Sequence, residues 1–461
     1  MSEFENIVPP NEETPDIQPN EPAQSVEENI PKINPTTKNV LTEPINPAGL
    51  VSIAKKYRKI VALIAIILAV IIALCSVFSS GSGDGKTLFV DDMLVFTEIN
   101  VENNTIMYGV IDKKGEIVID ADFTYSAIVG DGMIVAQEPP MGDSAHASSL
   151  ASYGLIDSKG TEITKFSYSD CGLEFTEGML PMAEDGKWGF ADKDGKWVIE
   201  PKFDGALSFY EGLAGAKDTK SRKWGFIDDK GKWEIKAEFE DAGSFKDGIA
   251  PAKLDGKWGF VDKDGKWAIK NKFLYVNAFS DKVAIAQDVN ENWGTIDEKG
   301  EWIIKPRFQE IKEFSDGIAA AKKNGKWGFI DKDGKWIIDN DYYDAGSFVD
   351  GLAYAQEEKG GKYGYINDDG KWKIEPKYDE ATDFSQGLAC VKEGKKYGYI
   401  NKSGKTKIDF RYKYAMPFYA DGYAPVLTGD KNSSENDEWF VIDTKGKSIF
   451  EKGNTFDGLS R

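Results

Sequence analysis

The sequence predicts an all-β tandem repeat array that follows one transmembrane helix and a disordered N-terminal tail. Three observations predict it. An aromatic-glycine pair recurs at intervals of 34–36 residues through the middle of the chain. Apolar and polar residues alternate within each copy, which is typical of half-buried strands. An apolar run of nineteen residues lies near the N-terminus, ahead of the first copy.

The N-terminal tail, residues 1–54, holds nine prolines, nine acidic residues and two lysines. Its apolar residues are sparse and show no period. Such a segment cannot bury enough apolar surface to offset the entropy lost on ordering, so we expect it to be disordered. It is either a solvated tail or a docking peptide for a cytoplasmic partner.

The apolar run extends from Ile60 to Phe78, and four basic residues stand immediately before it. Nineteen residues at a rise of ~1.5 Å span ~28 Å, close to the hydrocarbon thickness of a bilayer. We therefore assign residues 55–79 to a basic flank and a transmembrane helix, and residues 80–88 to a linker. Positive charge stays in the cytoplasm, which places the tail inside and the remaining chain outside. A cleavable signal peptide, a lipoprotein signal and a buried core helix are weaker interpretations.

The charge balance excludes one class of partner. Lys and Arg total 57 against 77 Asp and Glu, a net charge of −20. Nucleic-acid binding needs a basic surface, so we expect no nucleic-acid partner. The three cysteines show no CxxC spacing, which argues against a zinc site. A disulfide between Cys171 and Cys390 is left open.

Residues 89–461 form the repeat region, with about ten units. The aromatic-glycine pair occurs at Tyr108, Tyr153, Trp188, Trp224, Trp258, Trp293, Trp327, Tyr363 and Tyr397, and a degenerate copy has Trp439-Phe440. The first and last intervals are longer than the others. Degenerate outer copies are what a repeat array needs as caps.

Each unit predicts a three-stranded meander. Lys-Trp-Gly-Phe-Ile-Asp is the first strand, Asp-Lys-Asp-Gly is a tight turn, and a second strand completes a hairpin. Proline donates no ladder hydrogen bond, so we expect Pro201, Pro306 and Pro376 to end the second strand. A connector with two aromatic residues leads to a third strand at Leu213. Because a closed propeller usually has ~4–8 blades, we favour an open, twisting array, with one or two closed propellers as the alternative.

The residue pattern of the third strand predicts which of its side chains are packed and which are exposed. Alanine recurs at its second position, and alanine or valine two residues later, which predicts close packing against another strand or sheet. The residue between them varies from copy to copy, so we expect it to be exposed or lightly packed. At this variable position, three residues are the candidate partner contacts: Pro251, Ile285 and Tyr354.

The twelve tryptophans lie in two series. The first series, in the first strand, is Trp188, Trp224, Trp258, Trp293, Trp327 and Trp439. The second series, in the second strand, is Trp197, Trp233, Trp267, Trp302, Trp336 and Trp372. Aromatic residues repeated in register predict a structural core between repeats. The rival interpretation is a row of sugar-stacking platforms.

These residues carry a family resemblance. Trp-Gly-Phe-Ile-Asp, an Asp/Lys/Gly turn, Lys-Trp, Glu-Pro-Lys-Phe and a closing Phe-x-x-Gly-Leu-Ala resemble the bacterial WG repeat over about residues 100–461. The resemblance implies a β-repeat of the kind found in many surface and membrane proteins, with an interaction role. It implies no catalytic residue.

Motifs for chemistry are sparse. The one histidine, His146, gives no Ser/His/Asp or Cys/His arrangement. The turns at Asp192, Asp262 and Asp331 suggest calcium, but the further acidic positions of an EF-hand are missing. We expect no enzyme, cofactor or metal site. The leading hypothesis is a membrane-anchored, extracytoplasmic binding or scaffold module for a protein or envelope polymer. The alternatives are an envelope sensor signalling through the N-terminal tail and a carbohydrate-binding module.

Overall fold

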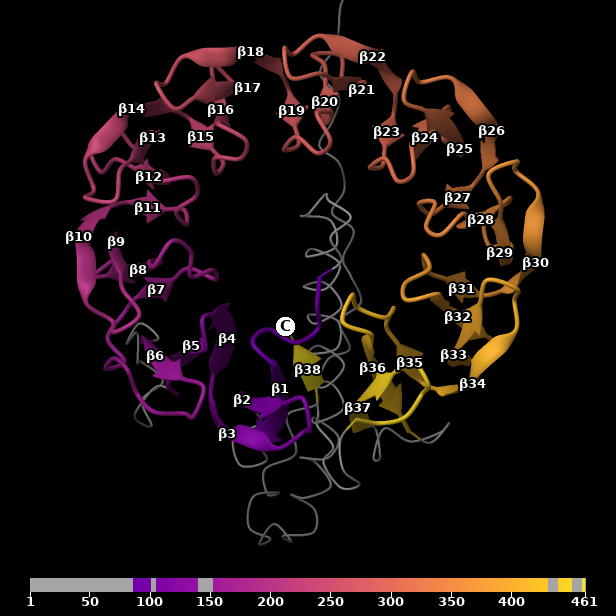
Figure 1. Ribbon diagram of the computed structural model, residues 1–461, viewed down its shortest axis with the longest axis horizontal. Coiled ribbons are helices and arrows are strands. Elements are labelled where there is room, and N and C mark those ends of the chain that lie inside the picture. The colour runs from indigo at the N-terminus through magenta and orange to yellow at the C-terminus, as the bar shows by residue number, and fades with distance from the viewer. Residues whose placement is uncertain (1–85, 101–104, 140–151, 430–437, 450–457, 461) are drawn as a thin grey trace, which may run out of the picture. The chain divides into compact units, whose positions relative to one another are not determined.

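The computed structural model describes residues 86–100, 105–139, 152–429, 438–449 and 458–460. Throughout these residues the regular elements are β-strands, grouped into ten antiparallel sheets that stand as blades around a ring (Figure 1). The predicted all-β repeat array is therefore confirmed. The predicted disordered tail (1–54) and the predicted transmembrane helix (60–78) lie outside the described residues. Within those ranges, the structure has no helix that is both long and apolar enough to cross a bilayer.

The strands occupy four positions from the centre of the ring to its rim. The innermost strands are β4 (Tyr125–Gly130), β7 (Asp170–Cys171), β11 (Gly205–Ala206), β15 (Asp241–Ala242), β19 (Tyr275–Val276), β23 (Glu310–Ile311), β27 (Asp344–Ala345), β31 (Glu380–Ala381), β35 (Tyr414–Ala415) and β38 (Gly458–Ser460). The second strands are β1 (Met93–Asn100), β5 (Met133–Gln137), β8 (Leu180–Glu184), β12 (Ala214–Lys217), β16 (Ile249–Leu254), β20 (Ala284–Gln287), β24 (Ile318–Lys323), β28 (Ala353–Gln356), β32 (Leu388–Glu393) and β36 (Tyr423–Thr428).

The third strands are β2 (Thr105–Asp112), β6 (Tyr153–Asp157), β9 (Lys187–Ala191), β13 (Trp224–Ile227), β17 (Lys257–Asp262), β21 (Trp293–Ile296), β25 (Lys326–Asp331), β29 (Tyr363–Ile366), β33 (Lys396–Asn401) and β37 (Glu438–Asp443). The outer strands are β3 (Ile117–Phe123), β10 (Trp197–Phe203), β14 (Trp233–Phe239), β18 (Trp267–Phe273), β22 (Trp302–Phe308), β26 (Trp336–Tyr342), β30 (Trp372–Tyr378) and β34 (Thr406–Tyr412). We number the blades 1–10 in chain order, with β11–β14 as blade 4 and β19–β22 as blade 6.

Two details of the predicted meander are wrong. The connector contains a fourth strand of two residues, such as β11, which belongs to the next blade. The second strand of the predicted hairpin also continues through its proline: Pro201 lies inside β10, and Pro306 and Pro376 lie inside β22 and β30. These strands form the outer edge of their sheets, where a missing N–H donor breaks no ladder hydrogen bond.

The glycine of the aromatic-glycine pair is required by a close approach of two strands. A Cβ on Gly259 would lie 2.5 Å from the Ile269 carbonyl oxygen and 2.6 Å from the Asn271 nitrogen. The pairing of β17 with β18 shifts register at this point, so the outer strand bulges across the glycine. No residue with a side chain fits there without displacing the outer strand.

Consecutive blades share one core. One cluster contains Leu213 and Phe226 of blade 4 together with Ala250, Ala252 and Val261 of blade 5. The third strand of the predicted unit is the second strand of its blade, counted from the centre. Its two small-residue positions are buried in this way around the ring, which confirms their predicted packing. Alanine at these positions lets neighbouring sheets approach closely.

The ring is closed by the two ends of the repeat region, so the open array we favoured is wrong. Strand β38 pairs with β1, and Leu459 lies opposite Phe96. It supplies the innermost strand of blade 1, the place that Gly205–Ala206 take in blade 4. A buried cluster joins blade 1 to blade 10 and includes Leu88, Phe89, Leu94, Met416, Leu427 and Val441. The degenerate end copies are therefore partners in closure and not caps.

The closing strand generates the first prediction. Deleting Gly458–Ser460 leaves the inner edge of β1 unpaired, so its amide hydrogens should exchange at least about tenfold faster. Amides of β16 in the distant blade 5 are the internal control and should change little. Unchanged exchange in β1, measured by mass spectrometry, would mean that β38 does not hold the ring closed.

The close approach of the outer strand to the glycine of the aromatic-glycine pair generates the second prediction. Gly259→Ala should lower the free energy of unfolding by about 2–4 kcal/mol, since overpacking must displace the outer strand. Lys257→Ala, two residues away at an exposed position, is the matched control. Thermal melts of the two variants provide the measurement, and equal melting temperatures would contradict the packing argument.

Candidate functional site

The antiparallel order of each blade gives the ring two different faces. One face carries two kinds of loop: those that join the innermost to the second strand, and the Asp-Lys-Asp-Gly turns that join the third to the outer strand. We call it the turn face. The turns from the second to the third strand lie on the other face. The crossovers from each outer strand to the next innermost strand are also there, so we call it the crossover face.

The turn face carries acidic residues that brace neighbouring blades. The Glu177 carboxylate accepts the Gly212 N–H at 3.1 Å, and Glu211 accepts the Gly248 N–H at 3.0 Å. Lys263 of the next blade forms an ion pair with Glu211 at 3.2 Å. These turn carboxylates therefore hold the ring together as hydrogen-bond acceptors.

The turn aspartates that suggested calcium are occupied by their own turns. Oδ1 of Asp192 accepts the N–H groups of Asp194 and Lys196, both at 2.9 Å. Asp262 accepts the equivalent N–H groups of Asp264 and Lys266. This geometry explains the aspartate as a turn residue. Among the described residues, no group of three or more His, Cys, Asp or Glu is placed to hold a metal ion.

The crossover face carries a three-residue row in each blade, formed by directly paired positions. A row consists of the first residue of the innermost strand, the residue opposite it in the second strand and the aromatic residue of the aromatic-glycine pair, as in Gly205, Lys217 and Trp224. The Lys217 ammonium lies 5.9 Å from the centre of the Trp224 ring, and Lys253 lies at the same distance from Trp258. A cation over an indole is attractive and covers that part of the ring.

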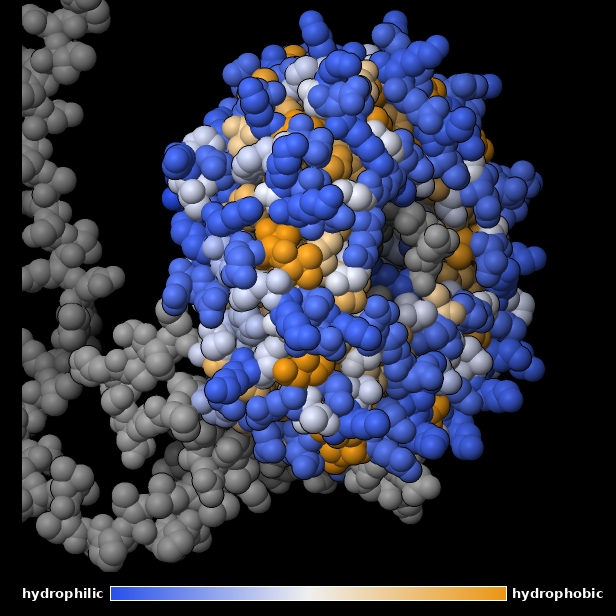
Figure 2. All heavy atoms as spheres, turned by 60° about the vertical axis from the view of Figure 1, so that its left-hand side comes forward, coloured by the Kyte–Doolittle hydropathy of each residue, from blue (hydrophilic) through white to orange (hydrophobic). Residues whose placement is uncertain are grey.

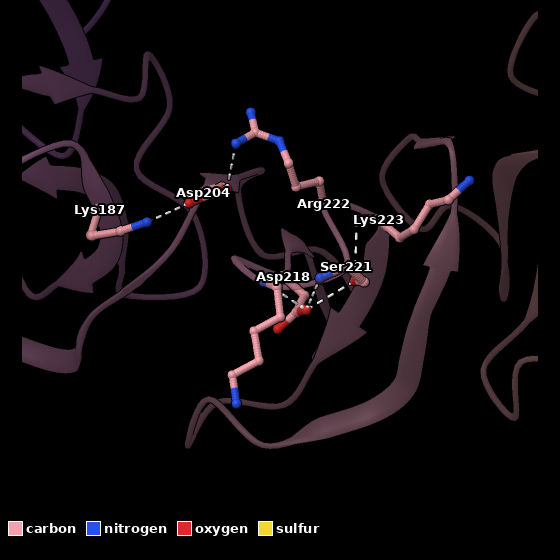
Figure 3. A network of polar contacts seen from close by, with 7 residues as sticks. Lys187, Asp204, Asp218, Ser221, Arg222 and Lys223 are labelled. Carbon is pink, nitrogen blue, oxygen red and sulfur yellow. Dashed lines mark hydrogen bonds and ion pairs between the residues drawn. The ribbon is translucent and has the colours of Figure 1, made fainter.

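Charged residues extend this face around blades 3 and 4 (Figure 3). Asp204, in the crossover between the blades, pairs with Lys187 at 2.6 Å and with Arg222 at 3.5 Å. Lys187 holds the pKa of the Asp204 carboxyl below its usual range. Asp218 closes the neighbouring turn by accepting the Ser221 N–H at 2.7 Å. The crossover face of these blades is thus a network of ion pairs.

The tryptophans lie at contacts between blades, most of them half-buried and Trp327 only 5% exposed. Those of the second series meet an aromatic ring of the preceding blade edge to face. The pairs are Tyr168–Trp197, Phe203–Trp233, Phe239–Trp267, Phe273–Trp302, Phe308–Trp336 and Tyr342–Trp372, with centroids 5.3–6.1 Å apart. The first series, Trp188, Trp224, Trp258, Trp293, Trp327 and Trp439, packs against the shared cores.

The variable position between the two small residues of each second strand is less exposed to solvent than we predicted. Ile285 is 7% exposed and packs in the core between blades 6 and 7, so its expected exposure is wrong. Pro251 and Tyr354 are half-buried. Both faces of a blade pack against neighbouring blades, so even the residue between the two alanines meets another sheet. Cys171 and Cys390 are free, Cys390 being buried, so the disulfide left open between them is not formed.

Tyr354 belongs to a polar cluster at blades 7, 8 and 9. Its ring lies 5.8 Å from that of Tyr363 and 5.8 Å from the Lys312 ammonium, which donates to the Ala345 carbonyl at 2.7 Å. Asp383 accepts the Ser347 N–H at 3.1 Å. Burial raises the pKa of Asp383 to about 6, against the opposing effect of Lys312. Lys312 and Asp383 were missed from sequence, although most other copies have uncharged residues there.

The comparisons with known proteins agree with the repeat. The model of the WG containing repeat matches residues 108–138, 153–188, 188–218, 224–258, 258–292, 293–327, 327–363, 363–397 and 397–431, more than half of the chain. No curated protein matches the chain.

Solved structures give only remote likenesses. A crystal structure of the eukaryotic initiation factor is 8% identical with a TM-score of 0.42, covering 67% of this chain and 95% of that one. BamB from Moraxella catarrhalis is 11% identical with a TM-score of 0.30, covering 58% and 87%. The computationally designed Ika8 protein is 12% identical with a TM-score of 0.31, covering 62% and 95%. At these scores nothing is carried over from them.

The polar cluster generates the third prediction. The folded chain holds the Asp383 proton up to about pH 6, whereas the unfolded chain releases it near pH 4. This group therefore favours the folded state at low pH, and that contribution is lost as the pH rises from about 4 to 6. Asp383→Asn keeps the acceptor for Ser347 and removes the charge. It should raise stability at pH 7 by about 1–2 kcal/mol and leave stability at pH 4 nearly unchanged.

Chemical denaturation at both pH values measures this difference. Asp204→Asn, which removes a carboxylate of lowered pKa, is the control and should not stabilise the chain at pH 7. An Asp383→Asn variant that is less stable than the parent at pH 7 would show that the ionised carboxylate is favourable where it lies.

Proposed function

The chain belongs to the family of WG-containing repeat proteins, and from that premise we propose that it is a membrane-anchored binding or scaffold module. The ring lies outside the cytoplasm on a single-pass helix at residues 60–78. It holds a protein or an envelope polymer, while the N-terminal tail stays in the cytoplasm. The proposal includes no chemical reaction.

One observation carries the binding role. The residues that define the repeat are used by the frame of the ring: the tryptophans lie between blades and the glycine of the pair admits the outer strand. The residues that differ between copies include the first two positions of the rows on the crossover face. A constant frame that presents different side chains in different blades is suited to recognition and supplies an extended surface for it.

The character of the surface supports a polar partner. The face drawn in Figure 2 is mostly hydrophilic, with small, separate apolar spots. Exposed apolar residues of the outer strands, such as Val198, Ile303 and Ile337, belong to different strands. Permanent interfaces are usually more apolar than this, so a partner held by polar contacts fits better.

The anchor is supported by the sequence before the ring. Phe78 ends the apolar run, and Lys86 already takes part in the ring, where its carbonyl accepts the Ala420 N–H at 3.0 Å. Such a short connection would hold the ring near the membrane surface. The basic residues before the run favour the cytoplasmic side for the tail.

The proposal is tested by photo-crosslinking in the source cells, and this is the fourth prediction. A photo-reactive residue replaces one of three exposed residues: Val198 on the outer rim, Asp241 on the crossover face or Asp247 on the turn face. A binding module should give crosslinks to a defined partner from one or two of these positions. The absence of a defined adduct from all three positions would contradict the proposal.

The topology is checked in the same cells. Protease added to intact cells should remove the ring and spare an N-terminal tag. Loss of the tag with an intact ring would reverse the proposed orientation and would place the partner in the cytoplasm.

A further inference from the structure

The row of blade 6 differs from its neighbours because it is aromatic and uncharged. Tyr275 lies opposite Gln287, and Gln287 lies opposite Trp293, so the three side chains are cross-strand neighbours on β19, β20 and β21. In blades 5 and 7 the same positions read Asp241, Lys253, Trp258 and Glu310, Lys322, Trp327. Blade 6 has thus exchanged an acid and a lysine for a tyrosine and an amide.

The exchange leaves aromatic surface accessible. Tyr275 is 47% exposed, and its ring meets that of Trp293 at 5.4 Å with an interplanar angle of 64°. On its inner side Trp293 packs against the core that contains Phe308 and Ile311, which fixes the indole. Lysine ammonium groups lie over the corresponding tryptophans of blades 5 and 7, but in the described part of the chain none lies over Trp293.

The polar groups beside the rings are amides. The Gln287 side chain donates to the Glu291 carbonyl at 3.0 Å, which orients its amide within the row. The neighbouring turn includes Asn290 and Asn292, whose N–H groups are both held by Asp288 at 2.9 Å. Blade 6 therefore presents an amide oriented by the backbone next to an exposed ring.

The chemistry of this row selects among ligands. A cationic ligand would find a better site at the acidic residues of blades 5 and 7, and an anionic ligand at their lysines. A neutral sugar has a face of C–H bonds that packs on an aromatic ring, and hydroxyl groups at its edge that bond to amides. Rigid aromatic side chains give such a contact at a small loss of conformational entropy.

We propose that the row Tyr275–Gln287–Trp293 of blade 6 is a binding site for a neutral oligosaccharide. The inference rests on the proposed binding function and names one ligand class for it. The tryptophan series as a whole belongs to the frame, and sugar recognition is confined to blade 6. Tyrosine takes the same position in blades 2 and 10, as Tyr125 and Tyr414, but those two residues are half-buried whereas Tyr275 is exposed.

The test, which is the fifth prediction, uses the full chain in a detergent without a sugar headgroup. The probes are cellohexaose and chitohexaose as neutral oligosaccharides and a galacturonate hexamer as an anionic one. We expect saturable binding of at least one neutral probe, followed by tryptophan fluorescence and calorimetry. The anionic probe should bind at least about tenfold more weakly, because the chain carries a net charge of −20.

Two variants locate the site. Tyr275→Ala removes the exposed ring and should weaken binding at least tenfold. Gln287→Lys gives blade 6 the lysine that blades 5 and 7 already carry, so the fold tolerates it, and an ammonium over Trp293 should also weaken binding at least tenfold. Asp241→Ala, at the equivalent position of blade 5, is the control and should bind as the parent does.

Three results would overturn the inference: neither neutral probe binds at millimolar concentration, the galacturonate binds best, or both variants bind as the parent does. If crosslinking from the ring still yields a defined protein partner, the binding module stands and only the sugar site fails. If crosslinking fails as well, both proposals fall.

Discussion

The ring depends on the fit between an isoleucine in each outer strand and the turn glycine of the next blade. A Cβ on Gly231 would lie 2.6 Å from Cγ2 of Ile199, and one on Gly265 would lie 2.9 Å from Cγ2 of Ile235. Both glycines have positive φ, which the tight turn requires. The turn thus rests on the preceding blade, and Lys202 donates to the Gly231 carbonyl at 3.0 Å across the same contact. Each blade is stabilised mainly through its neighbour.

Because each blade is stabilised by contacts with its neighbours, blades 1 and 10 would each lack one neighbour unless they packed against each other. The seam between blades 10 and 1 is built from different contacts. The Phe89 N–H donates to the Asp421 carboxylate at 3.1 Å, and the Phe89 ring meets Tyr423 at 5.4 Å. The cluster around Leu88 then covers both end blades with apolar side chains. The end copies depart from the repeat because they form this seam, and an open array would leave the same surfaces in water.

Local features of the blade could be predicted from the sequence, and long-range ones could not. Alternation located the strands, and the Asp/Gly turns located the hairpins, because both signals act over a few residues. The prediction at Pro201 was wrong because the free-energy cost of a proline depends on whether its strand lies at the edge of the sheet. That position is set by the strand order of the whole sheet. Ile285 misled it since alternation assumes one solvated face, whereas these sheets pack on both faces. Lys312 and Asp383 were missed because charge alone is uninformative in so acidic a chain.

The repetition makes its own exceptions informative, because other blades show what the frame needs at each position. Serine stands at the position of Asp383 in blades 4, 5 and 8, as Ser208, Ser244 and Ser347, so the fold does not require a carboxylate there. Burial makes the ionised form unfavourable, which the raised pKa of Asp383 records. The lysine of blades 5 and 7 likewise shows that the frame does not require Gln287 in blade 6. Residues that the frame neither needs nor favours are therefore the positions from which the proposed binding function would draw its specificity.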